Sequence, residues 1–380
     1  MSKKKVIIIV SAVLILVITI RTIYLNIAYK SKEPKEQTKI TQETANTEIV
    51  TQNEEIEKTE EIKEWKWQKD SPENHNINPI ILQNLHNTYD TTQIFSSVIV
   101  KDGYIIDEYY KEGYNETSKF ILNSASKSIT SSLIGIAIDK GYIENENVPI
   151  SKYFPEIQSS NSEYAKQITI WHLLTHTSGI NISDTENWDE WRNSENWVQY
   201  ILDAPVTSKP GTVFNYSTTN THLLCAILQK ATGMTAYEFG KKYLFDPIGM
   251  ESVQCEKDAQ GISDGGNGFI MNIYDMLKFG QLYLKDGVWE EEQIISNQWV
   301  NASTTLQFKR SSGSANYGYQ WWVRTFGTQN YAAYFAQGHA GQYIFVIPNL
   351  ELVIAFTSNH TGSSSMYWQF VNQIVSAYQE

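Results

Sequence analysis

The order of strand-like and helix-like segments is the strongest constraint on how this chain can fold. Residues 94–100 and 104–110 are rich in β-branched and aromatic side chains, and the Lys-Asp-Gly between them favours a hairpin turn. Three more strands are predicted close to the C-terminus, at residues 331–337, 342–347 and 352–357. Because strand patterns lie at both ends of this region and helix patterns between them, we expect one sheet built from both ends, with a helical subdomain inserted.

Helix patterns fill the middle of the chain and close its C-terminus. Residues 126–140 place Ile129, Leu133 and Ile136 on one apolar face, and Gly141 supplies a C-terminal stop. Further helices are predicted at residues 221–231, 236–244, 273–284 and 366–378. The predicted fold class is therefore α+β, a mixed α/β domain over residues 66–380, which is long enough to bury a large core.

The first 29 residues have the composition of a membrane segment. Three lysines precede an uncharged apolar run at residues 6–20, and apolar side chains continue past Arg21. This pattern predicts an uncleaved signal anchor at residues 1–29, which would form a transmembrane helix and place the rest of the chain outside the cytoplasm. A cleaved signal peptide, which would make the protein secreted, is the alternative, although no clear A-x-A cleavage site follows the run.

Residues 30–65 have the composition of a disordered acidic linker. Eight Glu and two Lys give residues 41–65 a net charge of −6 (2 − 8), half of the −12 carried by the whole chain. Since so few apolar side chains are present, this segment cannot bury enough surface to fold. The acidic balance also argues against nucleic acid as a partner, because phosphate binding needs a basic surface.

Two pairs of residues leave more than one interpretation open. Cys225 and Cys255 are too few for a disulfide framework, so buried free thiols are expected, and a single disulfide is the alternative. His172 and His176 have the spacing of a helical metal pair, but Leu173 stands where a zinc protease carries Glu. Structural roles are therefore expected for both histidines. No metal or cofactor is predicted.

The segment Ser124-Ala-Ser-Lys127 is the strongest candidate for chemistry. A serine hydroxyl is a poor nucleophile near neutral pH and needs a base close by. If Ser124 opens a helix, Lys127 lies one turn further on the same face, where a desolvated amine could be neutral and accept a proton. Because Ser2 to Lys5 matches the same short pattern, the motif needs support from other parts of the chain.

Two later segments supply that support. Tyr216 follows a Lys-Pro-Gly turn and precedes a helix pattern, so its oxygen could carry a proton if cationic neighbours lower its pKa from about 10. His339 lies between small residues in Gly-His-Ala-Gly-Gln, directly before a predicted strand. Small residues there would let a substrate approach the backbone, where a strand-edge N–H could meet an oxyanion.

The order of these motifs resembles the serine β-lactamase-related family, which includes class C β-lactamases, DD-peptidases, related esterases and 6-aminohexanoate-dimer hydrolases. The resemblance covers roughly residues 75–380 and implies an antiparallel sheet flanked by helices, beside an all-helical region, with the active site between them. In chain order the motifs are Ser-x-x-Lys at 124–127, His-Leu-Leu-Thr-His-Thr-Ser-Gly at 172–179, Tyr-Ser-Thr at 216–218 and Gly-His-Ala-Gly-Gln at 338–342.

The resemblance also implies a role for each matching residue. Ser124 would be the acylated nucleophile, Lys127 would help to deprotonate it, and Tyr216 would pass the proton to the leaving group. The backbone N–H groups of Ser124 and Gln342 would form the oxyanion hole, in which each donor typically contributes about 10²–10³ in rate.

Two positions depart from the pattern of β-lactamases and DD-peptidases. Thr218 stands where they usually carry Asn, so the contact with the lysine and the substrate is expected to be weakened or lost. His339 and Gly341 stand where many relatives have the lysine and the glycine of Lys-Thr-Gly. A histidine holds a substrate carboxylate less reliably than lysine, so efficient β-lactam hydrolysis is not expected.

We therefore expect an extracytoplasmic serine hydrolase, anchored in the cell membrane, that cleaves an ester, amide or peptide through an acyl-enzyme. Its partners would be the membrane and a small-molecule or peptide substrate, with peptidoglycan fragments among the candidates. One alternative is a DD-peptidase or penicillin-binding protein acting on cell-wall stem peptides; another is a non-catalytic wall-binding or sensory domain. One or two tryptophans of a larger set are expected to line the cleft: Trp188, Trp191, Trp197, Trp321 and Trp322.

Overall fold

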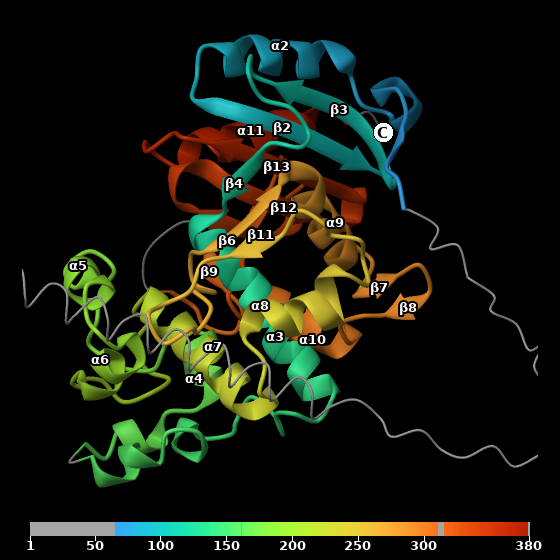
Figure 1. Cartoon of the computed structure of the whole chain (residues 1–380). Helices are drawn as coiled ribbons and strands as arrows, with labels where there is room; N and C mark the ends of the chain where they lie inside the picture. Colours follow the sequence, from blue (N-terminus) through green and yellow to red (C-terminus); the bar gives the residue numbers. More distant parts are fainter. Residues whose placement is uncertain (1–64, 161, 311–314, 379–380) are drawn as a thin grey trace, which may run out of the picture. The chain divides into compact units, whose positions relative to one another are not determined.

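An eight-stranded sheet crosses the part of the chain that the computed structural model describes, residues 65–378 except 161 and 311–314 (Figure 1). Its strand order is β1-β3-β2-β13-β12-β11-β10-β9, and every pair is antiparallel except β1 with β3. In chain order the strands are β1 (Gln68–Lys69), β2 (Ile94–Lys101), β3 (Tyr104–Tyr110), β9 (Asn316–Tyr317), β10 (Trp322–Phe326), β11 (Tyr331–Gly338), β12 (Gln342–Ile347) and β13 (Leu352–Ser358).

The pairing of β2 with β13 joins the two ends of this region in the middle of the sheet. Val100 lies opposite Val353, and Ile99 lies opposite Ile354. The β2–β3 hairpin turns at Asp102 and Gly103, both with positive φ (54° and 86°), as a type I′ turn requires. The predicted sheet built from both ends of the chain is therefore confirmed.

Helices cover both faces of the sheet because its central strands are apolar on both sides. On β12, Ile344 and Val346 join the core that contains α3 (Ser126–Asp139) and α9 (Ile273–Leu284). Phe345 belongs to the opposite core, with α2 (Pro79–Asp90) and α11 (Ser365–Ser376). A strand buried on both faces has a continuous apolar run instead of an alternating one, and all six residues of β12 are buried.

Helix α3 lies inside the molecule, between the sheet and the inserted helical region (Figure 1). Every residue from Ser126 to Ala137 is buried, including five serine and threonine side chains. The inserted region and its flanks contain α4 (Ile170–Leu174), α5 (Trp188–Arg192), α6 (Trp197–Asp203), α7 (Thr218–Thr232), α8 (Ala236–Gly240) with a π-turn (Lys241–Phe245), and α10 (Asn297–Thr304). Two small sheets complete the strands: β4 (Lys119–Ile121), β6 (Phe269–Asn272) and β5 (Gln254–Cys255), and β7 (Val288–Trp289) with β8 (Glu292–Gln293).

The helix predictions hold, with shifts at their ends. Helix α7 begins at Thr218, three residues before the prediction, and ends at Gly233 with φ 75° as expected. The predicted helix 236–244 is α-helical only to Gly240, where the π-turn takes over. Cys225 and Cys255 are free thiols, so the alternative of a disulfide is wrong.

The predicted anchor at residues 1–29 and nearly all of the predicted linker at 30–65 lie outside the described residues. Within residues 65–378, apart from the five left out, no helix is long and apolar enough to cross a bilayer. The described residues from Trp65 onward belong to one compact unit.

The close packing of α9 on the sheet gives a test of the fold. A Cβ atom at Gly280 would lie 2.5 Å from Val353 Cγ1 and 2.9 Å from Ile344 Cγ2. We expect Gly280→Val to lower the free energy of unfolding by about 1–3 kcal/mol, because the added atoms overpack this interface. Urea denaturation followed by tryptophan fluorescence measures the change. An unchanged midpoint would show that α9 does not pack this closely on the sheet.

Candidate active site

Ser124 lies in a short 3₁₀ turn, η2 (Asn123–Ala125), that leads directly into α3. Asn123 has a positive φ of 49°, uncommon for a residue other than glycine, and its Nδ2 donates to the carbonyl of His339 at 3.0 Å. A Cβ atom at Gly338 would lie 2.0 Å from the carbonyl oxygen of Leu122. The serine turn and the end of β11 are thus held in direct backbone contact.

The amine of Lys127 lies beneath Ser124 and has three oxygen partners. Its Nζ lies 2.9 Å from each of Ser124 Oγ, Thr218 Oγ1 and the carbonyl oxygen of Gly266. The side chain is only 1% exposed, and burial lowers the pKa of Lys127 from its ordinary value to about 8, although Asp184 and Asp264 act in the opposite direction. Near neutral pH a measurable fraction of the lysine is therefore the neutral amine, as the sequence predicted.

Thr218 keeps its contact with the lysine, so the expected loss of this contact does not occur. The contact is kept because Thr218, the first residue of α7, is placed so that its buried hydroxyl lies within hydrogen-bond distance of the amine. Asp184 fixes this hydroxyl by accepting from Thr218 Oγ1 at 2.6 Å and from its backbone N–H at 2.7 Å. A carboxylate at a helix N-terminus also interacts favourably with the positive end of the helix dipole.

Asp184, Gly266 and Asn267 are site residues that the sequence analysis missed. Asn267 Oδ1 lies 3.4 Å from Ser124 Oγ, and Asn267 follows the Gly266 carbonyl that accepts from Lys127. A Cβ atom at Gly266 would lie 2.5 Å from Thr218 Cγ2, so only glycine fits there. The Gly-Gly-Asn-Gly run at 265–268 was the signal that could have found this loop, because consecutive glycines mark a close approach of backbone to other atoms.

Tyr216 is a neutral phenol, not a tyrosinate. Lys127 Nζ lies 5.1 Å from the centre of its ring, yet burial raises the pKa of Tyr216 far more than a hydrogen bond with Ser124 lowers it. The condition considered for a proton carrier, a pKa lowered by cationic neighbours, is therefore not met. Since the phenol keeps its proton near neutral pH, it can relay a proton only by giving one and taking another at the same oxygen.

A cavity of about 230 Å³ opens above Ser124. Tyr216, His339 and Gly341 line it, while Lys127, Thr218 and Gln342 are buried around it. Of the five tryptophans singled out in the sequence, Trp322 lines the cavity, which agrees with the expectation of one or two. The remaining lining residues come from the C-terminal end of β11, the start of β12 and the segment that runs from the end of β13 into α11: Gln337, Gly338, Ala340, Tyr343, His360, Thr361, Gly362, Ser364 and Tyr367.

The turn between β11 and β12 carries the last predicted motif, His339 to Gln342. His339 is exposed, and Gly341 has a φ of 92°. A Cβ atom at Gly341 would lie 1.8 Å from Tyr367 Oη, so glycine is required both by conformation and by space. Gln342 opens β12 opposite Gly338, and its own side chain is tied to the carbonyl of Ser358 at 2.7 Å. Any contribution of Gln342 to the cavity would therefore come from its backbone.

His172 and His176 have separate surroundings. His172 Nδ1 accepts from the backbone N–H of Thr169 at 3.0 Å, which caps α4. His176 is fully buried beneath Tyr216, with ring centres 4.7 Å apart, and burial holds its pKa well below the usual range. Its ring nitrogens lie within 3.4 Å of Asn220 Nδ2 and Gln320 Nε2. Each imidazole thus supports the polypeptide around the site.

Comparison with known proteins shows which family has this fold and these motifs. A family model described as Beta-lactamase matches residues 92–368, well over half of the chain. The chain belongs to the beta-lactamase family. It is 22% identical over 309 residues to the 6-aminohexanoate-dimer hydrolase of Paenarthrobacter ureafaciens, covering 76% of this chain and 78% of that protein.

Two further proteins show how wide the resemblance is. Penicillin-binding protein 4 of Amycolatopsis lactamdurans is 22% identical over 297 residues, which cover 68% of this chain and 76% of that protein. A solved Bacillus anthracis structure, provisionally named a 6-aminohexanoate-dimer hydrolase, superposes with a TM-score of 0.67 at 22% identity, over 77% of this chain and 80% of that one. The fold and the family of serine hydrolases are therefore confirmed.

The lowered pKa of Lys127 predicts how the reactivity of Ser124 depends on pH. If the neutral amine removes the serine proton, modification of Ser124 by a fluorophosphonate probe should speed up about tenfold between pH 7 and pH 9 and then level off. Intact-protein mass spectrometry at timed intervals gives the rate, with Ser124→Ala as the unreactive control. A rate that does not change over this range would show that Lys127 does not act as the base.

Proposed function

We propose that the protein is an extracytoplasmic serine hydrolase that cleaves an ester, amide or peptide through an acyl-enzyme on Ser124. The observation that carries this proposal is the 2.9 Å contact between Ser124 Oγ and the buried amine of Lys127, whose pKa lies near 8. An unprotonated amine in contact with a serine hydroxyl is what general-base activation of that nucleophile needs.

In the first half of the proposed reaction, neutral Lys127 takes the proton of Ser124 as Oγ bonds to the substrate carbonyl carbon. The carbonyl oxygen becomes an oxyanion, which the backbone N–H groups of Ser124 and Gln342 would stabilise. Tyr216 gives its proton to the departing alcohol or amine and regains one from Lys127. The bond from carbon to the leaving group breaks, and the acyl group stays on Ser124.

In the second half, water attacks the acyl carbon and the same groups act in reverse. A proton passes from the water to the Tyr216 and Lys127 pair and then to Ser124 Oγ as the acyl–oxygen bond breaks. The products are a carboxylic acid and the free enzyme. Asn267 lies beside Ser124 Oγ and supports the orientation of the nucleophile through its amide oxygen.

Support for an ester, amide or peptide substrate comes from two features. The first is the Gly-His-Ala-Gly-Gln segment, which places an exposed His339 where a lysine would hold a β-lactam carboxylate. The second is the likeness to a relative named 6-aminohexanoate-dimer hydrolase, whose name describes an amide substrate. The membrane location rests on the composition of residues 1–29 alone.

A DD-peptidase acting on cell-wall stem peptides is the second candidate. The likeness to a relative named penicillin-binding protein 4 favours it. Both candidates use the same acyl-enzyme, so they differ in the substrate that the cavity above Ser124 accepts and in how slowly the acyl group leaves.

The proposal is tested by giving the full chain short-chain nitrophenyl esters, nitroanilide amides and a labelled penicillin. We expect turnover of at least one ester or amide, with a loss of at least about 10³-fold in Ser124→Ala. Stable labelling by penicillin at Ser124, without turnover of the other compounds, would support the DD-peptidase instead. A folded protein that gives neither turnover nor label would contradict both, and would leave the non-catalytic alternative.

A further inference from the structure

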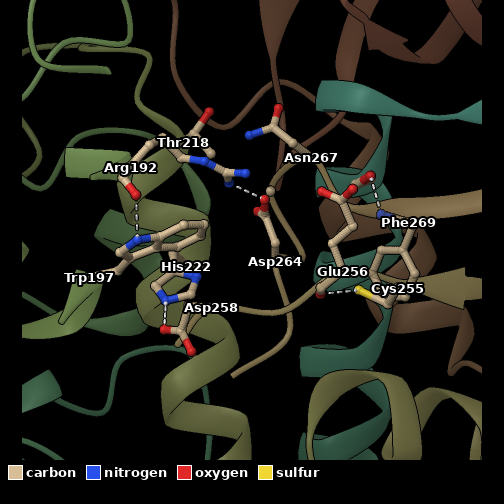
Figure 2. Close-up of polar contacts among 12 residues, drawn as sticks. Arg192, Trp197, Thr218, His222, Cys255, Glu256, Asp258, Asp264, Asn267 and Phe269 are labelled. Carbon is tan, nitrogen blue, oxygen red and sulfur yellow. Dashed lines mark hydrogen bonds and ion pairs between the residues drawn. The ribbon is translucent and has the colours of Figure 1, made fainter. Parts of the chain in front are cut away.

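Arg192 holds a position in the structure that the proposed reaction does not explain. It lies on α5 in the helical region, where its guanidinium stacks on Trp197 at 4.1 Å from the ring centre (Figure 2). The guanidinium also lies 5.3 Å from the ring centre of Trp188. It also forms an ion pair with the carboxylate of Asp264, whose side chain is 1% exposed. Trp197 completes the arrangement by donating from Nε1 to the backbone carbonyl of Arg192 at 3.1 Å.

Asp264 begins the loop that reaches the catalytic lysine. Its carbonyl oxygen accepts from the backbone N–H of Gly268 at 2.6 Å and of Asn267 at 3.3 Å, which closes a tight turn. The apex of that turn presents the Gly266 carbonyl to Lys127. Figure 2 shows the Arg192 guanidinium directed at the Asp264 carboxylate, with a dashed line for their ion pair. The side chain of Asp264 therefore fixes one end of a five-residue turn in which Gly266 contacts the base and Asn267 contacts the nucleophile.

The charge of Asp264 also acts on Lys127. Two carboxylates, Asp184 and Asp264, face the lysine from different elements, and both favour its charged form. The remaining titratable groups against it are Tyr216, which is neutral, and His176, whose pKa is held well below the usual range. Arg192 is the cation paired with Asp264, so it offsets one of the two charges that would keep the lysine protonated.

We propose that Arg192 is a positioning residue for the catalytic lysine. Its ion pair with Asp264 holds the 264–268 turn in place and neutralises the buried carboxylate of that turn. The proposal rests on the role of Lys127 as the base. Without Arg192, Asp264 would be a buried carboxylate that has no other side-chain partner among the described residues. Such a group both destabilises the turn and attracts a proton to Lys127.

The test compares the pH dependence of Ser124 acylation, by the fluorophosphonate probe and by the best ester substrate, in four full-length variants. We expect Arg192→Gln to move the midpoint of the rate profile up by about half to one pH unit and to lower the rate at pH 7 by about 3–10-fold, with recovery above pH 9. Asp264→Asn should move the midpoint down. In the double variant the midpoint should lie close to the wild-type value. Arg192→Lys, which keeps the positive charge, should move the midpoint much less than Arg192→Gln does.

Arg324→Gln is the matched control. Arg324 also stacks on two aromatic rings, Phe326 and Trp368, but it lies on β10 at the other side of the sheet and should leave the profile unchanged. Should Arg192→Gln fail to fold, Asp264→Asn and the double variant still test the proposal, because the midpoint should fall in Asp264→Asn and lie close to the wild-type value in the double variant. Equal profiles in all variants, or a loss of rate that is the same at every pH, would overturn the proposal. Failure of the wild-type chain to acylate at Ser124 would instead overturn the proposed function.

Discussion

The site depends on keeping an amine out of water while surrounding it with oxygen. Lys127 is buried among Ser124 Oγ, Thr218 Oγ1 and the Gly266 carbonyl, which satisfy its hydrogen bonds. Burial penalises the charged form, and the nearby carboxylates limit the size of that penalty. The balance leaves a pKa close to the pH at which a base is useful, and such tuning is a common property of active-site residues.

Three parts of the chain that are distant in sequence meet around this amine. The η2 turn supplies Ser124 and helix α3 supplies Lys127. Helix α7 supplies Thr218, and the 264–268 turn supplies a carbonyl and an amide. The sheet contributes the β11–β12 turn, which Asn123 joins to the serine turn by a hydrogen bond to His339. Since α3, α7, β11 and β12 all contribute to the buried core, these parts of the site stand on rigid elements.

The sequence predicted most of the architecture and the central pair of the site. Local patterns were enough for the β2–β3 hairpin, for α3 and for α9, because apolar periodicity and turn residues are encoded within short windows. Ser124 and Lys127 lie three residues apart, so their contact follows from helix geometry. Asp184 and Asn267 were missed since their contacts span 34 and 143 positions in the chain. The sequence left the pKa of Tyr216 open, and burial, a tertiary property that local patterns do not encode, raises it.

The most direct test of this account is a titration of Lys127 itself. Nitrogen NMR of the chain labelled with ¹⁵N-lysine, with the Lys127 signal assigned by its loss in Lys127→Met, reports the protonation of Nζ as pH is raised. The account predicts a midpoint near 8, well below that of the exposed lysines. A midpoint near the ordinary value of 10.5 would contradict it, because the amine would then be charged throughout the range in which it is proposed to act as a base.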